Sequence, residues 1–397
     1  MPMSDLPTDD HSSPIIASCE ERLLHLTLVF TNSLSAVHPL LLIPLWVGLA
    51  ALAGWPWRGH GLAVFGLALA LTTADALSLA LLPRLGRSYG PVLPPLLALG
   101  IVRTTLWMAV GLLWPTKLGL VATAVVHLAI LALSIYATWI EPFRLQTVHA
   151  TRRSPKLGNP KPLRLLHLSD LHVERMTDRE RRLIAEVAVL EPDLLVLTGD
   201  YLNLSYITDA EAQRQAHDFL SELCDASGCP VYAITGSPAV DRAEVIPAIF
   251  TDLPITWLDD QVTTLRIGTH TIQLAGLRCT RERTLDGPRL RCLLGPRMGP
   301  DAPFTLLLYH SPDLMPEAVA LGVDLYLCGH THGGQIRLPF FGAIITSSDF
   351  WKQYEMGRYN EAGTTLYVSR GLGMEGLGAP RARFLAPPEI TLWTLSR

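Results

Sequence analysis

The sequence predicts an α-helical membrane bundle followed by an α/β domain, and three observations support this prediction. Apolar residues make up 49% of the 397 residues, and the long apolar stretches all lie before about residue 140. From residue 163 onward, short apolar runs alternate with amphipathic stretches, which is the pattern of strand–helix–strand units with parallel pairing. Several of these short runs end at Asp or His, which predicts a site at one edge of the sheet.

Four segments are long and apolar enough to cross a bilayer, which requires about 20 residues. They lie at about residues 38–56, 62–82, 93–114 and 118–140. The tryptophans of this region fall mostly near the segment ends, as an interfacial belt would place them. A buried helical bundle of a water-soluble protein is the alternative, but no soluble domain needs four such segments in a row. We therefore expect four transmembrane helices within residues 38–140, after an N-terminal cytoplasmic segment at residues 1–37.

Basic residues outside these segments predict the orientation. Arg84 and Arg87 follow the second segment, and five more basic residues follow the fourth within residues 144–161, whereas the other two connections hold one each. By the positive-inside rule, both ends of the chain face the cytoplasm in a multi-pass protein of the inner (plasma) membrane. Residues 141–162 read as a basic juxtamembrane linker without periodicity, whose charges either favour anionic lipid or act only as a topology signal.

Two charged residues, Asp75 and Arg103, fall inside the second and third apolar segments. Both lie at roughly 11–15 Å from the connection that the two segments share, at ~1.5 Å rise per residue. We expect them to pair and so join two helices. The alternative is a functional role, such as a path for an ion or a lipid headgroup, because ionisable groups inside a membrane are costly.

The C-terminal part is expected to alternate strands and helices. The expected strands cover residues 163–168, 194–198, 231–235, 305–308 and 325–327, and the expected helices cover residues 178–190 and 210–223. Because the carboxyl ends of parallel strands meet at one edge of a sheet, residues that follow these strands should lie together.

Acidic and histidine residues follow four of these strands. The six are Asp170, His172, Asp200, His310, His330 and His332, and the last two stand in the run Gly-His-Thr-His-Gly-Gly-Gln at residues 329–335. Neutral imidazole nitrogens are the commonest protein ligands for metals, and glycine permits the tight bend that would let both histidines of this run face one point. Two divalent ions can clamp a phosphoryl group and activate a water molecule, and mixed Asp/His shells suit Mn, Fe, Zn or Ni.

The order Asp-x-His, Gly-Asp, a glycine turn, His and Gly-His-Thr-His resembles the calcineurin-like metallophosphoesterase superfamily. The extended motif at residues 329–335, together with Ser369–Gly373 and Pro387–Glu389, is similar to its membrane-anchored bacterial branch. The resemblance covers about residues 163–397 and implies a four-layer α/β/β/α sandwich that holds two divalent metal ions. It implies that the first metal is held by Asp170, His172, Asp200 and His332. It implies that the second is held by Asp200, His310 and His330, with Asp200 and His332 as catalytic residues.

The third family motif, Gly-Asn-His-Asp or Glu, departs from the pattern, because this chain has Gly236, Ser237, Pro238 and Ala239 instead. The resemblance implies that Ser237 stands where an Asn ligates the second metal, with a weaker hydroxyl ligand. Proline cannot transfer a proton, so the usual general acid is missing. Expulsion of a phosphate, whose second pKa is about 6, needs less acid assistance than expulsion of an alkoxide. Asp241 is either a substitute acid or an exposed carboxylate at a helix start.

Two functions from different classes follow from these observations. The first is a membrane-bound phosphohydrolase that cleaves a phosphoester or pyrophosphate bond of a membrane lipid or lipid-linked nucleotide. Family resemblance suggests UDP-2,3-diacylglucosamine, an intermediate of lipid A synthesis. The second is a catalytically impaired protein that binds or regulates a membrane partner. The net charge of -4 argues neither for nor against nucleic acid. Nucleic acid is not an expected partner, because no basic patch with interleaved aromatic residues is present.

Overall fold

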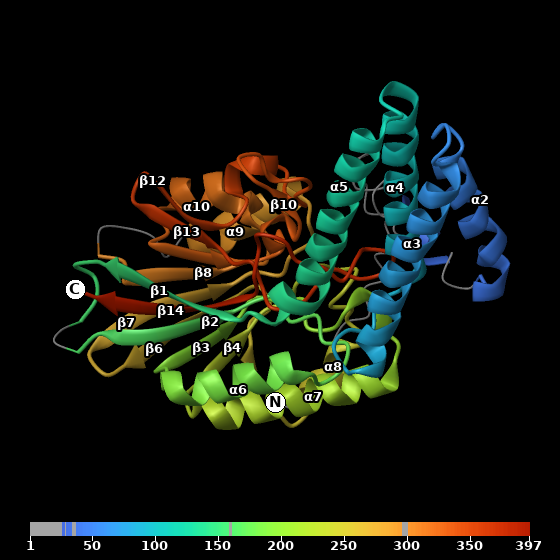
Figure 1. Ribbon diagram of the computed structural model, residues 1–397. Helices are drawn as coiled ribbons and strands as arrows, with labels where there is room; N and C mark the ends of the chain where they lie inside the picture. The colour runs from blue at the N-terminus through green and yellow to red at the C-terminus, as the bar shows by residue number, and fades with distance from the viewer. Residues whose placement is uncertain (1–25, 28, 34–36, 159–160, 296–300) are drawn as a thin grey trace.

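The computed structural model describes residues 26–27, 29–33, 37–158, 161–295 and 301–397. Most of the expected N-terminal cytoplasmic segment therefore lies outside the described residues. A helical region forms the first part of the described chain, and an α/β domain packs against one side of it (Figure 1).

Three helices of this region are long and apolar enough to cross a membrane. They are α3 (Gly61–Arg84), α4 (Leu93–Leu113) and α5 (Lys117–Ile135), the last of which continues through a π-helical turn at Tyr136–Ile140 and a 3-10 turn at Glu141–Phe143. The expectation of a fourth full-length span at residues 38–56 is wrong. That segment forms a 3-10 turn at Pro39–Leu42 and then α2 (Ile43–Gly54), whose 12 residues rise only about 18 Å. Pro56 contributes to its end, because proline has no backbone N–H and so cannot donate the next hydrogen bond of the helix.

Asp75 of α3 and Arg103 of α4 form the expected ion pair. Arg103 Nε lies 2.7 Å from Asp75 Oδ2, and the guanidinium also donates to Asp75 Oδ1. Arg103 reaches α5 as well, because its Nη1 donates to the backbone oxygen of His127 at 2.9 Å. All three side chains are buried. The pair therefore joins the three long helices to one another, which confirms the expected ion pair.

The segment expected to be a linker contains a strand. Residues Gln146–Arg153 form β1, which pairs in parallel with the C-terminal strand β14 (Glu389–Ser396) along its whole length. The helical region thus passes into the α/β domain after only two further residues, at 144 and 145. Residues 146–153 therefore belong to a sheet, and the expectation of an irregular surface segment is wrong for this stretch.

The first sheet has the strand order β1-β14-β2-β3-β4-β5. Its central strands are β2 (Leu163–Leu168), β3 (Leu194–Leu197) and β4 (Val231–Ala233), all parallel, and β5 (Ile255–Trp257) forms the far edge. Helices α6 (Asp178–Leu190), α7 (Ala210–Ser227) and α8 (Ile246–Phe250) pack on its outer face. Thr177 begins α6 with a capping box, in which Thr177 and Glu180 satisfy each other's backbone N–H groups.

The second sheet has the order β12-β13-β9-β8-β7-β6. Its strands are β6 (Gln261–Ile267), β7 (His270–Gly276), β8 (Phe304–Leu308), β9 (Leu325–Cys328), β12 (Gly357–Glu361) and β13 (Thr364–Val368). Helices α9 (Arg283–Leu294) and α10 (Met315–Leu321) cover it, and a small hairpin of β10 (Arg337–Leu338) and β11 (Gly342–Ala343) stands apart.

Three hydrophobic clusters hold these parts together. One lies between the first sheet and α6–α8, one between the two sheets, and one between the second sheet and α9–α10. The α/β domain is therefore layered as helices, sheet, sheet and helices, with two mixed sheets at its centre (Figure 1). Every strand and helix expected after residue 163 is present, with bounds that differ by a few residues at most.

Candidate metal centre

The carboxyl ends of four parallel strands bring six expected residues together. Asp170 and His172 follow β2, Asp200 follows β3, His310 follows β8, and both His330 and His332 follow β9. Five of these residues have left-handed backbones, with φ of 49° at Asp170, 41° at His172, 57° at Asp200, 70° at His330 and 51° at His332. Positive φ is uncommon outside glycine, and such strained positions cluster at functional sites. The backbone thus bends sharply to turn these side chains inward.

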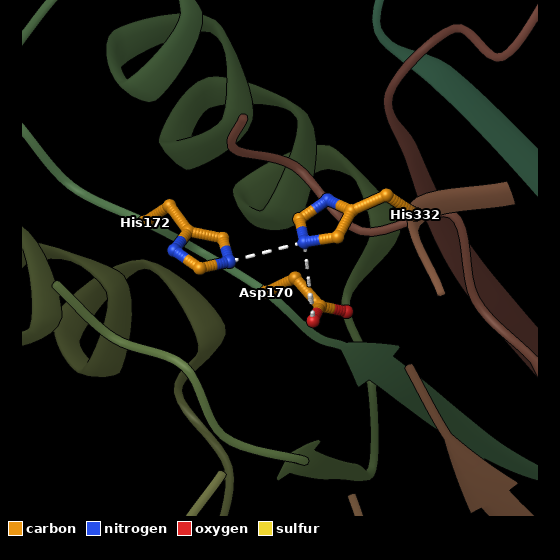
Figure 2. Close-up of side chains that lie close together, drawn as sticks. All are labelled: Asp170, His172 and His332. Carbon is orange, nitrogen blue, oxygen red and sulfur yellow. Dashed lines mark hydrogen bonds and ion pairs between the residues drawn. The ribbon is translucent and has the colours of Figure 1, made fainter. Parts of the chain in front are cut away.

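The first group consists of Asp170, His172 and His332, all buried (Figure 2). His172 Nε2 lies 3.1 Å from His332 Nε2, and His332 Nε2 lies 3.7 Å from Asp170 Oδ1. Figure 2 shows the two imidazole rings and the carboxylate directed toward a common point. A single cation can therefore contact one atom of each side chain.

The second group consists of Asp200, His310 and His330, also buried. His310 Nε2 lies 3.2 Å from His330 Nδ1 and 3.3 Å from Asp200 Oδ2. The hydroxyl of Ser237, which follows β4, enters the same group at 3.2 Å from His310 Nε2 and 3.4 Å from His330 Nδ1. The structure thus places Ser237 Oγ beside the side chains of the second group.

Asp200 stands between the two groups. Its Oδ2 lies 3.3 Å from His310 Nε2 in the second group and 3.6 Å from His172 Nε2 in the first. The same carboxylate is held in place by the backbone N–H of Ser237, which donates to Asp200 Oδ1 at 2.6 Å. This geometry suits a carboxylate that bridges two ions.

The histidine hydrogen bonds show that these residues fit divalent cations. His310 Nδ1–H donates to the backbone oxygen of Thr198 at 2.7 Å, and His330 Nε2–H donates to that of Ser347 at 2.9 Å. Each bond fixes the tautomer of the neutral ring, so the other nitrogen of each ring carries a lone pair when that ring is neutral. Those two nitrogens face each other at 3.2 Å and would repel without a cation or proton between them.

The electrostatics point the same way. Burial keeps the pKa of His330 and of His332 well below the ordinary value, so both rings are neutral at pH 7, as metal ligation requires. Burial also lowers the pKa of His310, but the carboxylate of Asp200 outweighs it and raises that pKa to about 9. Burial disfavours ionised Asp200, yet the charge of His310 holds the pKa of Asp200 well below its usual range. The pocket therefore attracts positive charge.

Two glycines allow the carboxylates to approach the backbone this closely. A Cβ on Gly329 would lie 2.0 Å from Asp170 Oδ2, and a Cβ on Gly236 would lie 2.1 Å from Asp200 Oδ1. Any side chain at either position would displace a carboxylate of the site. The glycines at the start of the Gly-His-Thr-His and Gly-Ser-Pro stretches are thus required by packing around the ligands.

Asp241 is not the exposed carboxylate that one of its two sequence interpretations expected. It is buried, and its Oδ2 accepts hydrogen bonds from the backbone N–H of Asp200 at 2.8 Å and of Gly236 at 2.6 Å, while Oδ1 accepts from Tyr201 at 3.0 Å. Burial, followed by the charge of Asp200, raises the pKa of Asp241 to about 7. Asp241 therefore holds the turns that carry Asp200 and Ser237, and it is not an exposed carboxylate.

Arg383 is a site residue that the sequence did not reveal. Its buried guanidinium donates to the backbone oxygens of Gly373 and Ala386, and its Nη2 lies 3.5 Å from His332 Nδ1. Burial lowers the pKa of Arg383 to about 9. Arg383 donates hydrogen bonds to several backbone oxygens of the loop after β13, which fixes its guanidinium beside His332. No motif in the sequence distinguishes it from an ordinary surface arginine.

Comparisons with known proteins agree with this geometry. The family model described as calcineurin-like phosphoesterase matches residues 163–334. The uncharacterized metallophosphoesterase YkuE of Bacillus subtilis is 32% identical over 268 residues, which are 66% of this chain and 88% of the relative. Phosphodiesterase YaeI of Escherichia coli is 29% identical over 60% of this chain and 83% of its own length. UDP-2,3-diacylglucosamine pyrophosphatase LpxG of Chlamydia trachomatis is 24% identical over 65% of this chain and 91% of its own length. The chain therefore belongs to the calcineurin-like metallophosphoesterase superfamily.

Proposed function

We propose that this protein is a membrane-held phosphohydrolase that uses two divalent metal ions to cleave a phosphoester or pyrophosphate bond. The observation that carries the proposal is the pair of ligand groups with one oxygen of Asp200 between them. When bound, two such ions clamp a phosphoryl group and supply an activated water molecule. Mn, Fe, Zn and Ni all suit the Asp and His donors.

The residues of the chain would then have distinct roles. Asp170, His172 and His332 would hold the first ion, and His310, His330 and the hydroxyl of Ser237 would hold the second. Asp200, whose Oδ2 lies near both groups, would contribute to holding both ions. Asp200 and His332 would also face the reacting phosphate, and Asp241 and Arg383 would position them from behind.

We propose a pyrophosphate bond of a lipid-linked nucleotide as the substrate, with UDP-2,3-diacylglucosamine of lipid A synthesis as the specific candidate. The name of the chlamydial relatives supports this choice, as do the apolar helices beside the site. Pro238 carries no proton to donate, and both oxygens of Asp241 already accept backbone hydrogen bonds. A leaving phosphate needs less acid assistance than an alkoxide, and such assistance is worth about 10²–10⁴-fold.

We further propose that the α/β domain lies on the cytoplasmic side of the inner (plasma) membrane. The basic residues after α3 and after α5 support this orientation. The connection between α3 and α4 also touches the domain, because Tyr89 N–H donates to Glu174 at 2.9 Å. The connection and the domain therefore lie on one side. The alternative of an impaired regulatory protein gains no support, because both ligand groups are complete.

The test is hydrolysis by the purified full-length chain in detergent with Mn²⁺. The two substrates are UDP-2,3-diacylglucosamine and bis(p-nitrophenyl) phosphate. We expect His310→Ala to reduce turnover of both by at least ~10², because metal ions supply most of the chemistry in such sites. His149→Ala, which removes an exposed histidine of β1, is the matched control and should retain wild-type activity. Equal activity of the two variants would contradict the proposed centre.

The altered third motif gives a second test. Ser237→Asn combined with Pro238→His restores the residue types of the family motif, so we expect faster cleavage of diesters with poor leaving groups. The gain should be smaller for a pyrophosphate, whose leaving group needs little acid assistance. Rates for a series of aryl phosphodiesters with different leaving-group pKa values measure this effect. An unchanged dependence on leaving group would refute the role assigned to this motif.

A further inference from the structure

A cavity of about 630 Å³ connects the helical region with the metal centre. One wall consists of α3, α4, the end of α5 with the turn that follows it, and Thr27 and Thr31 near the start of the described chain. The other wall consists of three loops of the α/β domain, at residues 331–336, 344–347 and 375–382. His332 belongs to the lining, so the cavity reaches a candidate metal ligand. Its volume falls within the range of roughly 300–1,000 Å³ of small-molecule sites.

The walls present mainly apolar groups. Ala98, Leu99 and Val102 of α4 line one side, and Ile344 and Ile345 line the other. Two hydroxyls in the wall are turned toward their own helix. Thr138 Oγ1 donates to the backbone oxygen of Ser134, and Ser134 Oγ donates to that of Ile130. These hydroxyls therefore add little polarity to the space.

Charged groups in the lining do not offer a phosphate site. Among the described residues, no Lys or Arg lines the cavity. Asp75 does line it, but both of its oxygens are engaged by Arg103. Glu375 accepts the backbone N–H of Gly376. A phosphate would therefore be bound at the metal centre and not within this space.

The cavity is deep along the helices. On α4 its lining runs from Pro94 to Val102, which is eight residue steps or about 12 Å along the helix axis. It also continues into apolar surface, because Val102 is 49% exposed and Ile345 is 52% exposed. The space thus extends from a helix that is long enough to cross a membrane to the edge of the metal centre.

We infer that this cavity binds an acyl chain of the substrate while the substrate's phosphate lies at the metal centre. The inference rests on the proposed function, and it identifies this cavity as the part of the protein that would select a substrate with an acyl chain. An apolar chain matches the walls, their depth and their continuity with the membrane-type helices. A soluble phosphodiester without an acyl chain would use the metal centre and leave the cavity unused.

The test narrows the cavity without changing the metal ligands. Ala98→Trp places a large ring in the lining. Ala109→Trp is the matched control, because Ala109 is also exposed, lies three turns further along the same face of α4, and is not part of the lining. Both variants should elute and unfold alike. We expect Ala98→Trp to lower kcat/KM for UDP-2,3-diacylglucosamine about tenfold or more, since one methylene in an apolar pocket changes kcat/KM by about 10–200-fold. Cleavage of bis(p-nitrophenyl) phosphate should not change.

The outcomes separate the two proposals. If the wild type cleaves both substrates and the two Trp variants behave alike, the acyl-chain site is refuted while the phosphohydrolase stands. If the wild type cleaves neither, the proposed function fails, and a lipid phosphate with a diazirine in its acyl chain tests the cavity alone. Labelling of residues 94–102 that Ala98→Trp abolishes would support the site. The site would be refuted if Ala98→Trp left the labelling intact, or if phosphatidylethanolamine competed equally well with the labelled lipid.

Discussion

Asp241→Asn is the sharpest test of how the second ligand group is built. The carboxylate of Asp241 accepts three backbone N–H bonds, two at Oδ2 and one at Oδ1. The single oxygen of asparagine can keep the pair from Asp200 and Gly236. Its amide N–H₂ must then face the backbone N–H of Tyr201. Because both groups are donors, the Tyr201 N–H loses its hydrogen bond. The substitution is nearly isosteric, so its effect reports hydrogen bonding and not a cavity.

The size of the effect follows from these bonds. Leaving one buried donor unsatisfied costs about 1–3 kcal/mol of folding stability. Because Asp241 fixes the turn that carries Asp200, part of this cost should appear in metal binding. Loss of a partner that orients a ligand weakens metal affinity by typically 10–100-fold, or ~1.4–2.7 kcal/mol. The two ranges overlap, which is expected if the same hydrogen bond is responsible.

Calorimetric titration of metal-free protein with Mn²⁺ measures the loss, and thermal unfolding with and without Mn²⁺ gives a second reading. Asp209→Asn is the matched control, because Asp209 caps α7 through the N–H of Ala212 and asparagine caps helices about equally well. We expect Asp209→Asn to bind Mn²⁺ as the wild type does. Wild-type affinity in Asp241→Asn as well would refute the positioning role of Asp241.

Two further predictions concern protons and buried charge. The pKa of His310 is about 9 without metal, so its imidazole is protonated at pH 7 and must lose a proton before it can bind a metal ion. The affinity for Mn²⁺ should therefore rise up to about tenfold per pH unit from pH 6.5 to 8.5. Titrations in two buffers of different ionisation enthalpy should show about one proton released per protein at pH 7, and none would contradict this assignment. In the helical region, Asp75→Asn leaves Arg103 buried without its partner and should cost about 3–5 kcal/mol. The double change Asp75→Leu with Arg103→Met should recover most of that loss in detergent unfolding, and equal loss in both would argue against the pair.

The sequence predicted which six side chains lie together, because the signals that place residues at strand ends are local. An apolar run followed by Asp170-x-His172 or by His330-x-His332 specifies both the strand and the turn, and parallel pairing then brings the ends together. The helical spacing of apolar residues also placed α6 correctly at residues 178–190, and the structure adds a capping box of Thr177 and Glu180 at its start. These features needed no knowledge of distant contacts.

The parts that the sequence missed depend on distant contacts. Asp241 and Arg383 act through backbone groups of other loops, and nothing in their own neighbourhood indicates such partners. Strand β1 was hidden because its sequence is polar and basic, as edge strands often are. The length of α2 was overestimated because the apolar run already begins at Pro39, whereas the α-helix begins only at Ile43, after a 3-10 turn, and ends at Gly54.

The parallel pairing of β1 with β14 has a consequence for any attempt to prepare the catalytic domain alone. A fragment that begins at Leu163 would lack β1 and leave one side of β14 without its eight-residue partner. The bared strand, which carries Ile390, Leu392 and Trp393, would then be a template for self-association. A fragment that begins at Gln146 retains β1 beside β14 and should stay soluble at concentrations where the shorter fragment precipitates.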